Sequence, residues 1–229
     1  MFTNTRLRVL NVKKKVLIFG TGGHAVSAAS LAEQCGFSVY SFISLQETIG
    51  EINGKQIRPI QSFPSGSKIS VVLAVGDNFL RESLTDELGL LAKRKNLEVT
   101  FPNLVHPSCH IGSHVKIGQG NQLFPGANLG ANSRIEDFVI LNHLSSLDHE
   151  SSMESFASLA PGVVTGGRVK IGRRAALLIN SAVSNGITIG SDAIIGANSF
   201  VKEDVVNNSL VAGSPAKFIR HQKAGDSYL

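Results

Sequence analysis

The side chains best suited to acid–base chemistry lie in the segment from Leu141 to Glu150 of this 229-residue chain. Its two histidines are His143 and His149, and the second is flanked by Asp148 and Glu150. Histidine titrates near neutral pH, so one ring nitrogen accepts a proton well when a carboxylate orients the other. The pattern therefore indicates a general base at His149, with a surface histidine that has no role as the alternative.

A second candidate site is the turn Gly20-Thr21-Gly22-Gly23-His24-Ala25, which follows an apolar run. Glycines at such a turn let a phosphate approach the backbone, and the start of a following helix offers unpaired N–H groups to the anion. The acidic residue that would hold an adenosine ribose is absent, because Ser44-Leu45-Gln46 stand at the end of the next strand. The turn therefore favours a nucleotide or nucleotide sugar over a nicotinamide cofactor. A tight turn without a ligand is the alternative.

A third turn, Gly76-Asp77-Asn78, ends another apolar run. Ligands of open parallel sheets bind at the carboxyl ends of the strands, so the two glycine turns are expected to face one ligand.

The elements that position these turns alternate between strand and helix. Apolar runs predict strands at residues 16–19, 39–43, 69–75 and 99–101, and apolar periodicity predicts helices at 25–36 and 83–95. Such alternation is typical of a parallel sheet flanked by helices. We therefore expect a small Rossmann-like α/β domain over residues 14–102.

The rest of the chain is organised by a repeat of six residues. Every sixth residue from Ile111 to Val201 is aliphatic or Met, apart from Thr165, and the residue four positions later is nearly always small or β-branched. This period fits a parallel β-helix in which three hexads form one triangular coil of 18 residues. The large residue points inward and the small one fills a corner. We expect this domain over residues 103–206, followed by a C-terminal extension over 207–229.

Composition limits the other possibilities. The two cysteines, Cys35 and Cys109, form no disulfide framework or metal cluster and suggest a cytoplasmic protein. No apolar run is long enough to span a bilayer, and residues 1–13 lack the features of a signal peptide and are interpreted as a flexible leader. The net charge of +5 is spread out, without the basic and aromatic clusters of a nucleic-acid-binding protein.

Several motifs occur in an order that resembles the sugar O-/N-acyltransferases of the sialic acid, bacillosamine and perosamine pathways. The resemblance covers about residues 14–220. The motifs are the turn at Gly20–Ala25, Ala74-Val75-Gly76-Asp77-Asn78 with Arg81, His106-Pro107, Asp148-His149-Glu150, Gly167-Arg168-Val169-Lys170-Ile171-Gly172 and Val211-Ala212-Gly213-Ser214-Pro215-Ala216-Lys217.

This resemblance implies a left-handed β-helix, a homotrimer, acetyl-CoA bound between adjacent β-helices and no metal. It implies that His149 is the base, Glu150 orients it, and the Gly167 N–H stabilises the oxyanion. The implied contacts of the nucleotide sugar are Gly22, Gly23, His24, Ser44, Gly76, Asp77, Asn78 and Arg81. The implied contacts of the CoA arm are Ser158, Gly167, Ile179 and Ala197.

Two departures from the family pattern concern ligand recognition. Ser44 and Leu45 replace the paired aspartates of relatives that hold UDP, and Ser158 stands where some relatives place a second histidine. Arg173 and Arg174 are candidates for contact with the CoA phosphates, with an exposed basic turn as the alternative.

The function that follows is acetyl transfer from acetyl-CoA to the amine of a nucleotide-linked amino-deoxy sugar, for bacterial surface-glycan or glycoprotein synthesis. Three alternatives stay open. They are O-acetylation of a sialic-acid-like sugar, a metallo-hydratase on the same fold, which needs three convergent histidines, and a binding module without catalysis. Neither a nucleic acid nor a membrane is expected as a partner.

Overall fold

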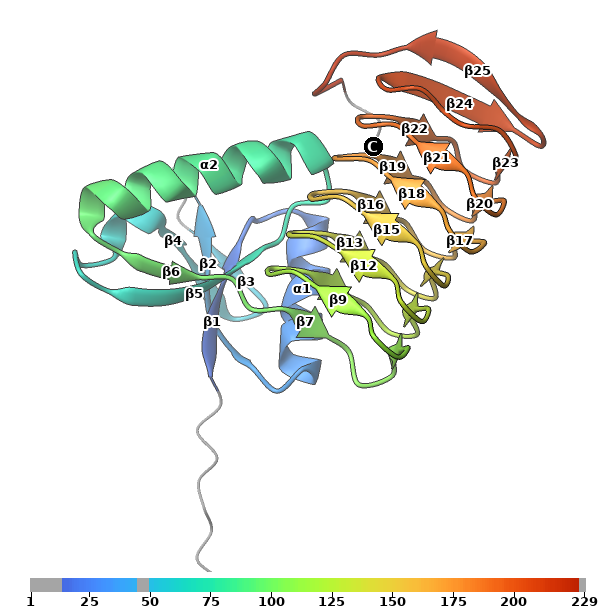
Figure 1. The fold of residues 1–229 in the computed structure, drawn as a ribbon. Coiled ribbons are helices and arrows are strands. Elements are labelled where there is room, and N and C mark those ends of the chain that lie inside the picture. The colour runs from blue at the N-terminus through green and yellow to red at the C-terminus, as the bar shows by residue number, and fades with distance from the viewer. Residues whose placement is uncertain (1–13, 45–49, 227–229) are drawn as a thin grey trace, which may run out of the picture.

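The structure is a computed structural model that describes residues 14–44 and 50–226. The predicted leader, residues 1–13, and the departure noted at Leu45 lie outside the described residues. Two parts follow each other along the chain, an α/β sheet and a stack of coils beside it (Figure 1).

The N-terminal part is a six-stranded sheet in the order β3-β4-β2-β1-β5-β6. All neighbouring strands are parallel except β3 and β4, which form an antiparallel hairpin. The strands are β1 (Lys15–Phe19), β2 (Ser38–Ser44), β3 (Glu51–Ile52), β4 (Lys55–Pro59), β5 (Lys68–Leu73) and β6 (Glu98–Thr100). The helices are α1 (Gly23–Gln34), the short 3₁₀ helix η1 (Ile60–Ser62) and α2 (Asn78–Lys95). The inward sides of β1 and β2 and one side of α1 are fully apolar, which forms the core between them.

The second part is a parallel β-helix whose three faces repeat in turn along the chain. We call them the covered, neutral and basic faces, for reasons given below. The covered face is β7 (Leu104–Val105), β10 (Gln122–Leu123), β13 (Ile140–Leu141), β16 (Ser158–Leu159), β19 (Ala176–Leu177) and β22 (Ile194–Ile195), with β24 (Ser209–Gly213) and β25 (Ala216–His221). The neutral face is β8 (His110–Ile111), β11 (Asn128–Leu129), β14 (Ser146–Leu147), β17 (Val164–Thr165), β20 (Ala182–Val183) and β23 (Phe200–Val201). The basic face is β9 (Lys116–Ile117), β12 (Arg134–Ile135), β15 (Ser152–Met153), β18 (Lys170–Ile171) and β21 (Thr188–Ile189).

The six-residue repeat predicted this arrangement. Paired residues on neighbouring coils are 18 apart, as in Arg134 with Ser152. The second residue of nearly every strand is buried, and together these residues form one continuous aliphatic core. Full burial of each aliphatic side chain is worth about 1.5–3 kcal/mol, which makes the stacked row the main source of stability here.

Five points of the predicted element pattern need correction. Helix α1 begins at Gly23 rather than 25, and α2 begins at Asn78 rather than 83, because the Asp77 side chain caps it by accepting the Leu80 N–H at 2.7 Å. The third strand ends at Leu73 instead of 75. The β3–β4 hairpin was not predicted, and the C-terminal extension adds β24 and β25 to the covered face.

The two parts share apolar cores, so they are held in one arrangement. Leu104, Phe124 and Ile140 of the covered face join the cluster around α1. Phe138 and Phe156, which stack with ring centroids 5.1 Å apart, join the cluster around α2 and β5.

A buried cation completes this contact. Arg81 on α2 is 1% exposed, and its guanidinium donates to the carbonyl oxygens of Val75, Gly76, Phe138 and Phe156. It also donates to Asn78 Oδ1 at 2.8 Å. One side chain thus ties the turn after β5, the start of α2 and two coils of the β-helix together, because each acceptor would otherwise be buried without a partner.

Replacing Arg81 by Met should lower the free energy of unfolding by about 3–5 kcal/mol, since the buried carbonyl oxygens lose a charged donor. Urea denaturation followed by circular dichroism measures the effect. The control is Arg134→Met, which removes an exposed arginine of the basic face and should change stability by less than about 0.5 kcal/mol. Equal losses in both variants would contradict the structural role of Arg81.

Candidate active site

The glycine turn opens into a cavity of about 540 Å³ at the carboxyl ends of β1, β2 and β5. Five of the predicted nucleotide-sugar contacts line it: Gly22, Gly23, His24, Ser44 and Gly76. The structure therefore brings together residues from three strand ends, as expected for a ligand at the edge of a parallel sheet.

Of the three glycines in this turn, Gly20 is the one that cannot be replaced without strain. Gly20 has φ +132°, and a Cβ there would lie 2.6 Å from the Ala74 carbonyl oxygen. Gly22 and Gly23 instead have open space where a side chain would project. The first turn of α1 has no side-chain cap and no acidic residue, and the Ala25 N–H donates to the Gly22 carbonyl oxygen at 2.9 Å. The N–H groups of Gly23 and His24 are therefore the ones available to an anion in the cavity.

His24 is held neutral in this turn. Gln122 Nε2 donates to the Leu73 carbonyl oxygen, which leaves Gln122 Oε1 facing His24 Nε2 at 3.1 Å. Burial and the nearby Arg81 cation lower the pKa of His24 from its ordinary value of 6.5 to about 4, against the opposing effect of the Gln122 bond. The neutral ring donates from Nε2 and keeps Nδ1 as an acceptor. Gln122 was not predicted, because no sequence signal links a coil residue to this distant turn.

A second cavity of about 520 Å³ joins the first. His24 and Gly76 line both, and the second continues along the β-helix past Ser158, Ile179 and Ala197. These are three of the four residues predicted to contact the CoA arm; the fourth, Gly167, does not line this cavity. Ile179 is 52% exposed, so the wall of this cavity presents an apolar side chain to solvent.

Three predicted substrate contacts lie behind the first cavity rather than on its wall. Asp77 caps α2, and Arg81 makes the buried bonds described above. Asn78 is 1% exposed and donates to the carbonyl oxygens of Arg174 and Ala175, both at 3.1 Å. This geometry supports a positioning role for the three, which fix the turn that carries Gly76.

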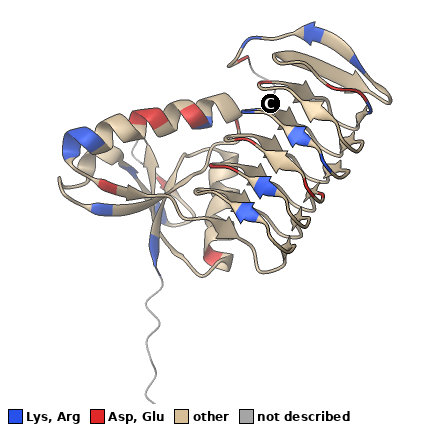
Figure 2. Ribbon diagram, in the orientation of Figure 1, with Lys and Arg blue, Asp and Glu red and all other residues tan. Residues whose placement is uncertain are grey.

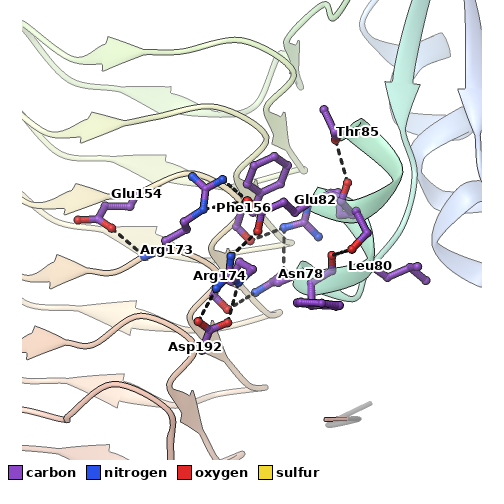
Figure 3. Close-up of polar contacts among 12 residues, drawn as sticks. Asn78, Leu80, Glu82, Thr85, Glu154, Phe156, Arg173, Arg174 and Asp192 are labelled. Carbon is purple, nitrogen blue, oxygen red and sulfur yellow. Dashed lines mark hydrogen bonds and ion pairs between the residues drawn. The ribbon is translucent and has the colours of Figure 1, made fainter. Parts of the chain in front are cut away.

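Arg173 and Arg174 lie at the corner between the basic and covered faces and pair within the chain (Figure 3). Both hydrogen-bond to Glu82 of α2, and Arg174 also binds Asp192 at 2.6 and 2.7 Å. Burial raises the pKa of the Glu82 carboxyl, but the hydrogen bonds from Arg174 and Arg173 outweigh burial and hold this pKa below its ordinary value. The arginines are not on the wall of either large cavity. Their predicted contact with CoA phosphates would require them to exchange these partners.

His149 lies at a different corner, in the turn between β14 of the neutral face and β15 of the basic face. Its Nδ1 is 3.2 Å from Glu150 Oε2. An ionised carboxylate only accepts, so Nδ1 carries the proton and Nε2 presents its lone pair. A Cβ on Gly167 of the next coil would lie 2.4 Å from Nε2, so only glycine at this position leaves room for the ring.

The Gly167 N–H is already used in the structure. It donates to Oδ1 of Asn185, one coil further on, at 3.1 Å. The predicted oxyanion role of this N–H would therefore require Asn185 to release it. Asn185 was missed in the sequence, because an asparagine in a surface turn carries no distinguishing pattern.

His149 is not on the wall of either cavity. The second cavity lies where the covered and neutral faces meet, at Ile179 and Ala197, whereas His149 lies where the neutral and basic faces meet. One edge of the neutral face thus carries the candidate base and the other edge carries the candidate ligand groove.

The three faces differ in what they present outward. The α/β part packs on the covered face. The basic face bears Lys116, Arg134 and Lys170 on β9, β12 and β18, visible as blue strands in Figure 2. The outward strand residues of the neutral face are all uncharged: His110, Asn128, Ser146, Val164, Ala182 and Phe200. Val164 and Phe200 are exposed there, which makes this face suited to packing against another protein surface.

Within residues 14–44 and 50–226, no group of three or more His, Cys, Asp or Glu side chains is placed to hold a metal ion. No helix in the same part of the chain is long and apolar enough to cross a membrane.

Comparison with known proteins gives consistent matches. Residues 15–88 match the PglD N-terminal domain. The chain is 23% identical over 206 residues to GDP-perosamine N-acetyltransferase of Escherichia coli O157:H7, covering 86% of this chain and 82% of that protein. It is 31% identical to serine acetyltransferase 2 of Arabidopsis thaliana, but over 61% of this chain and only 39% of that protein's length.

Solved structures match over nearly the whole chain. PerB from Caulobacter crescentus, in complex with CoA and GDP-perosamine, superposes with a TM-score of 0.78 at 27% identity, covering 91% of this chain and 98% of PerB. The acetyltransferase domain of PglB from Neisseria gonorrhoeae, in complex with acetyl coenzyme A, gives 0.80 at 27% identity and covers 90% and 100%.

The fold defines the class of hexapeptide-repeat proteins with a Rossmann-like N-terminal domain and a left-handed parallel β-helix, which confirms the predicted fold. Within that class the chain is similar to sugar N-acetyltransferases over most of its length, which supports the resemblance to the sugar O-/N-acyltransferases of the sialic acid, bacillosamine and perosamine pathways that its motifs indicated.

The lowered pKa of His24 predicts a pH dependence of stability. Between pH 6.5 and 4 the unfolded chain takes up a proton at His24 that the folded chain does not, so this residue makes the protein less stable as the pH falls. His24→Gln, which keeps a donor toward Gln122, should remove about 2–3 kcal/mol of the loss between pH 7.5 and pH 4. Urea unfolding of both proteins at the two pH values measures this. Identical pH dependence would contradict the assignment.

Proposed function

We propose that the protein transfers an acetyl group from acetyl-CoA to the amine of a nucleotide-linked amino-deoxy sugar. The observation that carries the proposal is the His149–Glu150 pair, with Nε2 of the base free above Gly167. The two joined cavities supply room for a nucleotide sugar at the glycine turn and for a pantetheine arm along the coils. Similarity to PerB, described with CoA and GDP-perosamine, supports this pair of substrates.

In this mechanism the sugar amine attacks the thioester carbonyl carbon while His149 Nε2 takes a proton from the nitrogen. The carbonyl π electrons move to oxygen and form a tetrahedral oxyanion. When it collapses, the C–S bond breaks, and the CoA thiolate receives the proton from the imidazolium. Glu150 stabilises that imidazolium through Nδ1. The products are the N-acetylated sugar and free CoA, and no covalent enzyme intermediate is needed.

The site must be assembled from two chains, because the base and the cavities lie at opposite edges of the neutral face. If three copies pack their neutral faces around a threefold axis, the His149 edge of one copy meets the cavity edge of its neighbour. The uncharged surface of this face, with Val164 and Phe200 exposed, favours such packing. We therefore propose a homotrimer in which each site takes its base from one chain and its cavities from the next.

The role of His149 predicts the behaviour of two variants. His149→Ala should lower kcat about 10²–10⁴-fold, which is the usual contribution of a positioned base. Glu150→Gln should cause a smaller loss, because the amide keeps an acceptor but not the charge that stabilises the imidazolium. Product formation is followed by mass spectrometry. The matched control is His114→Ala, an exposed histidine in a turn between β8 and β9 at the same corner, and it should stay within about twofold. Turnover of His149→Ala near that of wild type would disprove the assignment.

A mixing experiment tests the shared site. His149→Ala and Gly22→Trp, which fills the first cavity, should each be inactive alone. Co-expression of differently tagged copies, followed by isolation of mixed trimers, should restore activity. In each mixed trimer about one interface in three combines an intact base with an intact cavity from the neighbour. No recovery in isolated mixed trimers would place the whole site within one chain.

The acceptor is identified by offering acetyl-CoA with UDP-, GDP- and dTDP-linked amino sugars. We expect one nucleotide to give a product heavier by one acetyl group. Mild alkali removes an ester but spares an amide, so loss of the added mass would show O-acetylation instead.

A further inference from the structure

Asn185 lies beside the candidate base and has a donor to spare. Positions 149, 167 and 185 are 18 residues apart, so they occupy the same corner on three successive coils. The His149 ring covers Gly167 from the coil before, and the Asn185 carboxamide reaches the same glycine from the coil after. Both functional groups thus meet at one residue.

The Asn185 carboxamide is oriented by its contacts. Oδ1 accepts the Gly167 N–H at 3.1 Å and lies against the backbone of Gly166, where a Cβ would be only 1.9 Å away. Because an N–H needs an acceptor, this bond shows which end of the carboxamide is Oδ1. The NH₂ group, Nδ2, therefore faces away from the Gly167 N–H. Asn185 is exposed, and within the described part of the chain Nδ2 has no hydrogen-bond partner.

Two turns at another corner are held by the same hydrogen bond, and one of them uses an aspartate, which has no donor. At the corner between the basic and covered faces, Asp137 Oδ1 accepts the Gln119 N–H at 2.9 Å and lies against Gly118. Asn207 Oδ1 does the same for the Ser191 N–H, also at 2.9 Å. An aspartate is therefore sufficient to lock this turn. At the His149 corner, a carboxylate would instead repel an oxyanion.

We propose that Asn185 Nδ2 donates a hydrogen bond to the oxyanion that forms during acyl transfer, while the Gly167 N–H holds and polarises the carboxamide. This inference rests on the proposed acetyl transfer. The negative charge arises when the carbonyl π electrons move to oxygen as the amine nitrogen bonds to carbon. Nδ2 stabilises that charge without giving up its proton. When the C–S bond breaks, an oxygen lone pair re-forms the carbonyl π bond, and the negative charge leaves on the thiolate sulfur, which takes the proton from the imidazolium. Donors fixed in advance are the most effective kind for this purpose.

The decisive variant is Asn185→Asp. It keeps an oxygen that accepts the Gly167 N–H, as Asp137 does at its own corner, but replaces the donor with a second acceptor. We expect kcat to fall about 10²–10³-fold, as for removal of an oxyanion donor elsewhere. KM for acetyl-CoA and the thermal unfolding temperature should stay close to wild type. Asn185→Ala should lose a similar factor in kcat.

The matched control is Asn207→Asp, which makes the same chemical change in an equivalent turn away from His149 and should leave kcat within about twofold of wild type. Asn185→Asp activity within about threefold of wild type would overturn the proposal. The role of Asn185 would then be only to hold the turn through the hydrogen bond from the Gly167 N–H. A fall in kcat accompanied by a clear fall in the thermal unfolding temperature of Asn185→Asp would overturn it too. Wild type that transfers no acetyl group to any amino sugar would instead refute the proposed function itself.

Discussion

The coil length of the β-helix is the constraint on which the site depends. Because paired residues on successive coils are 18 apart, side chains at one corner stack directly over one another. That stacking brings the imidazole of His149, the backbone of Gly167 and the carboxamide of Asn185 together with no loop to position them. A site built on such a rigid element holds its geometry without a closing movement, which is the condition for effective preorganisation.

The same geometry separates the site into two halves. A triangular coil cannot place one residue at two corners, so the base and the ligand cavities occupy opposite edges of the neutral face. The α/β part is fixed on the covered face by the buried Arg81 and by the arginine–carboxylate cluster of Glu82, Arg174 and Asp192 (Figure 3). This contact directs the glycine turn toward the groove along the coils, where His24 and Gly76 join the two cavities.

The sequence predicted the β-helix well because burial there repeats with a fixed period. It also predicted the parallel sheet and the glycine turn, whose chemistry is local. It did not reveal the β3–β4 hairpin, whose strands of two and five residues carry no clear apolar alternation. Arg81 and Asn78 were interpreted as ligand contacts because they follow a glycine turn, whereas their side chains bond to coils about 60–100 residues later. Contacts between such distant segments leave no periodic trace, and the same reason hid Gln122. Asn185 is only one coil from Gly167, but an asparagine in a surface turn carries no distinguishing pattern.

The most direct measurement is a crystal structure of the protein with CoA and a nucleotide-linked amino sugar bound. The account predicts a trimer in which the sugar amine, held in the cavities of one chain, lies within hydrogen-bond reach of His149 Nε2 of the neighbouring chain. Both ligands bound along one chain, with His149 of every copy facing solvent, would contradict it.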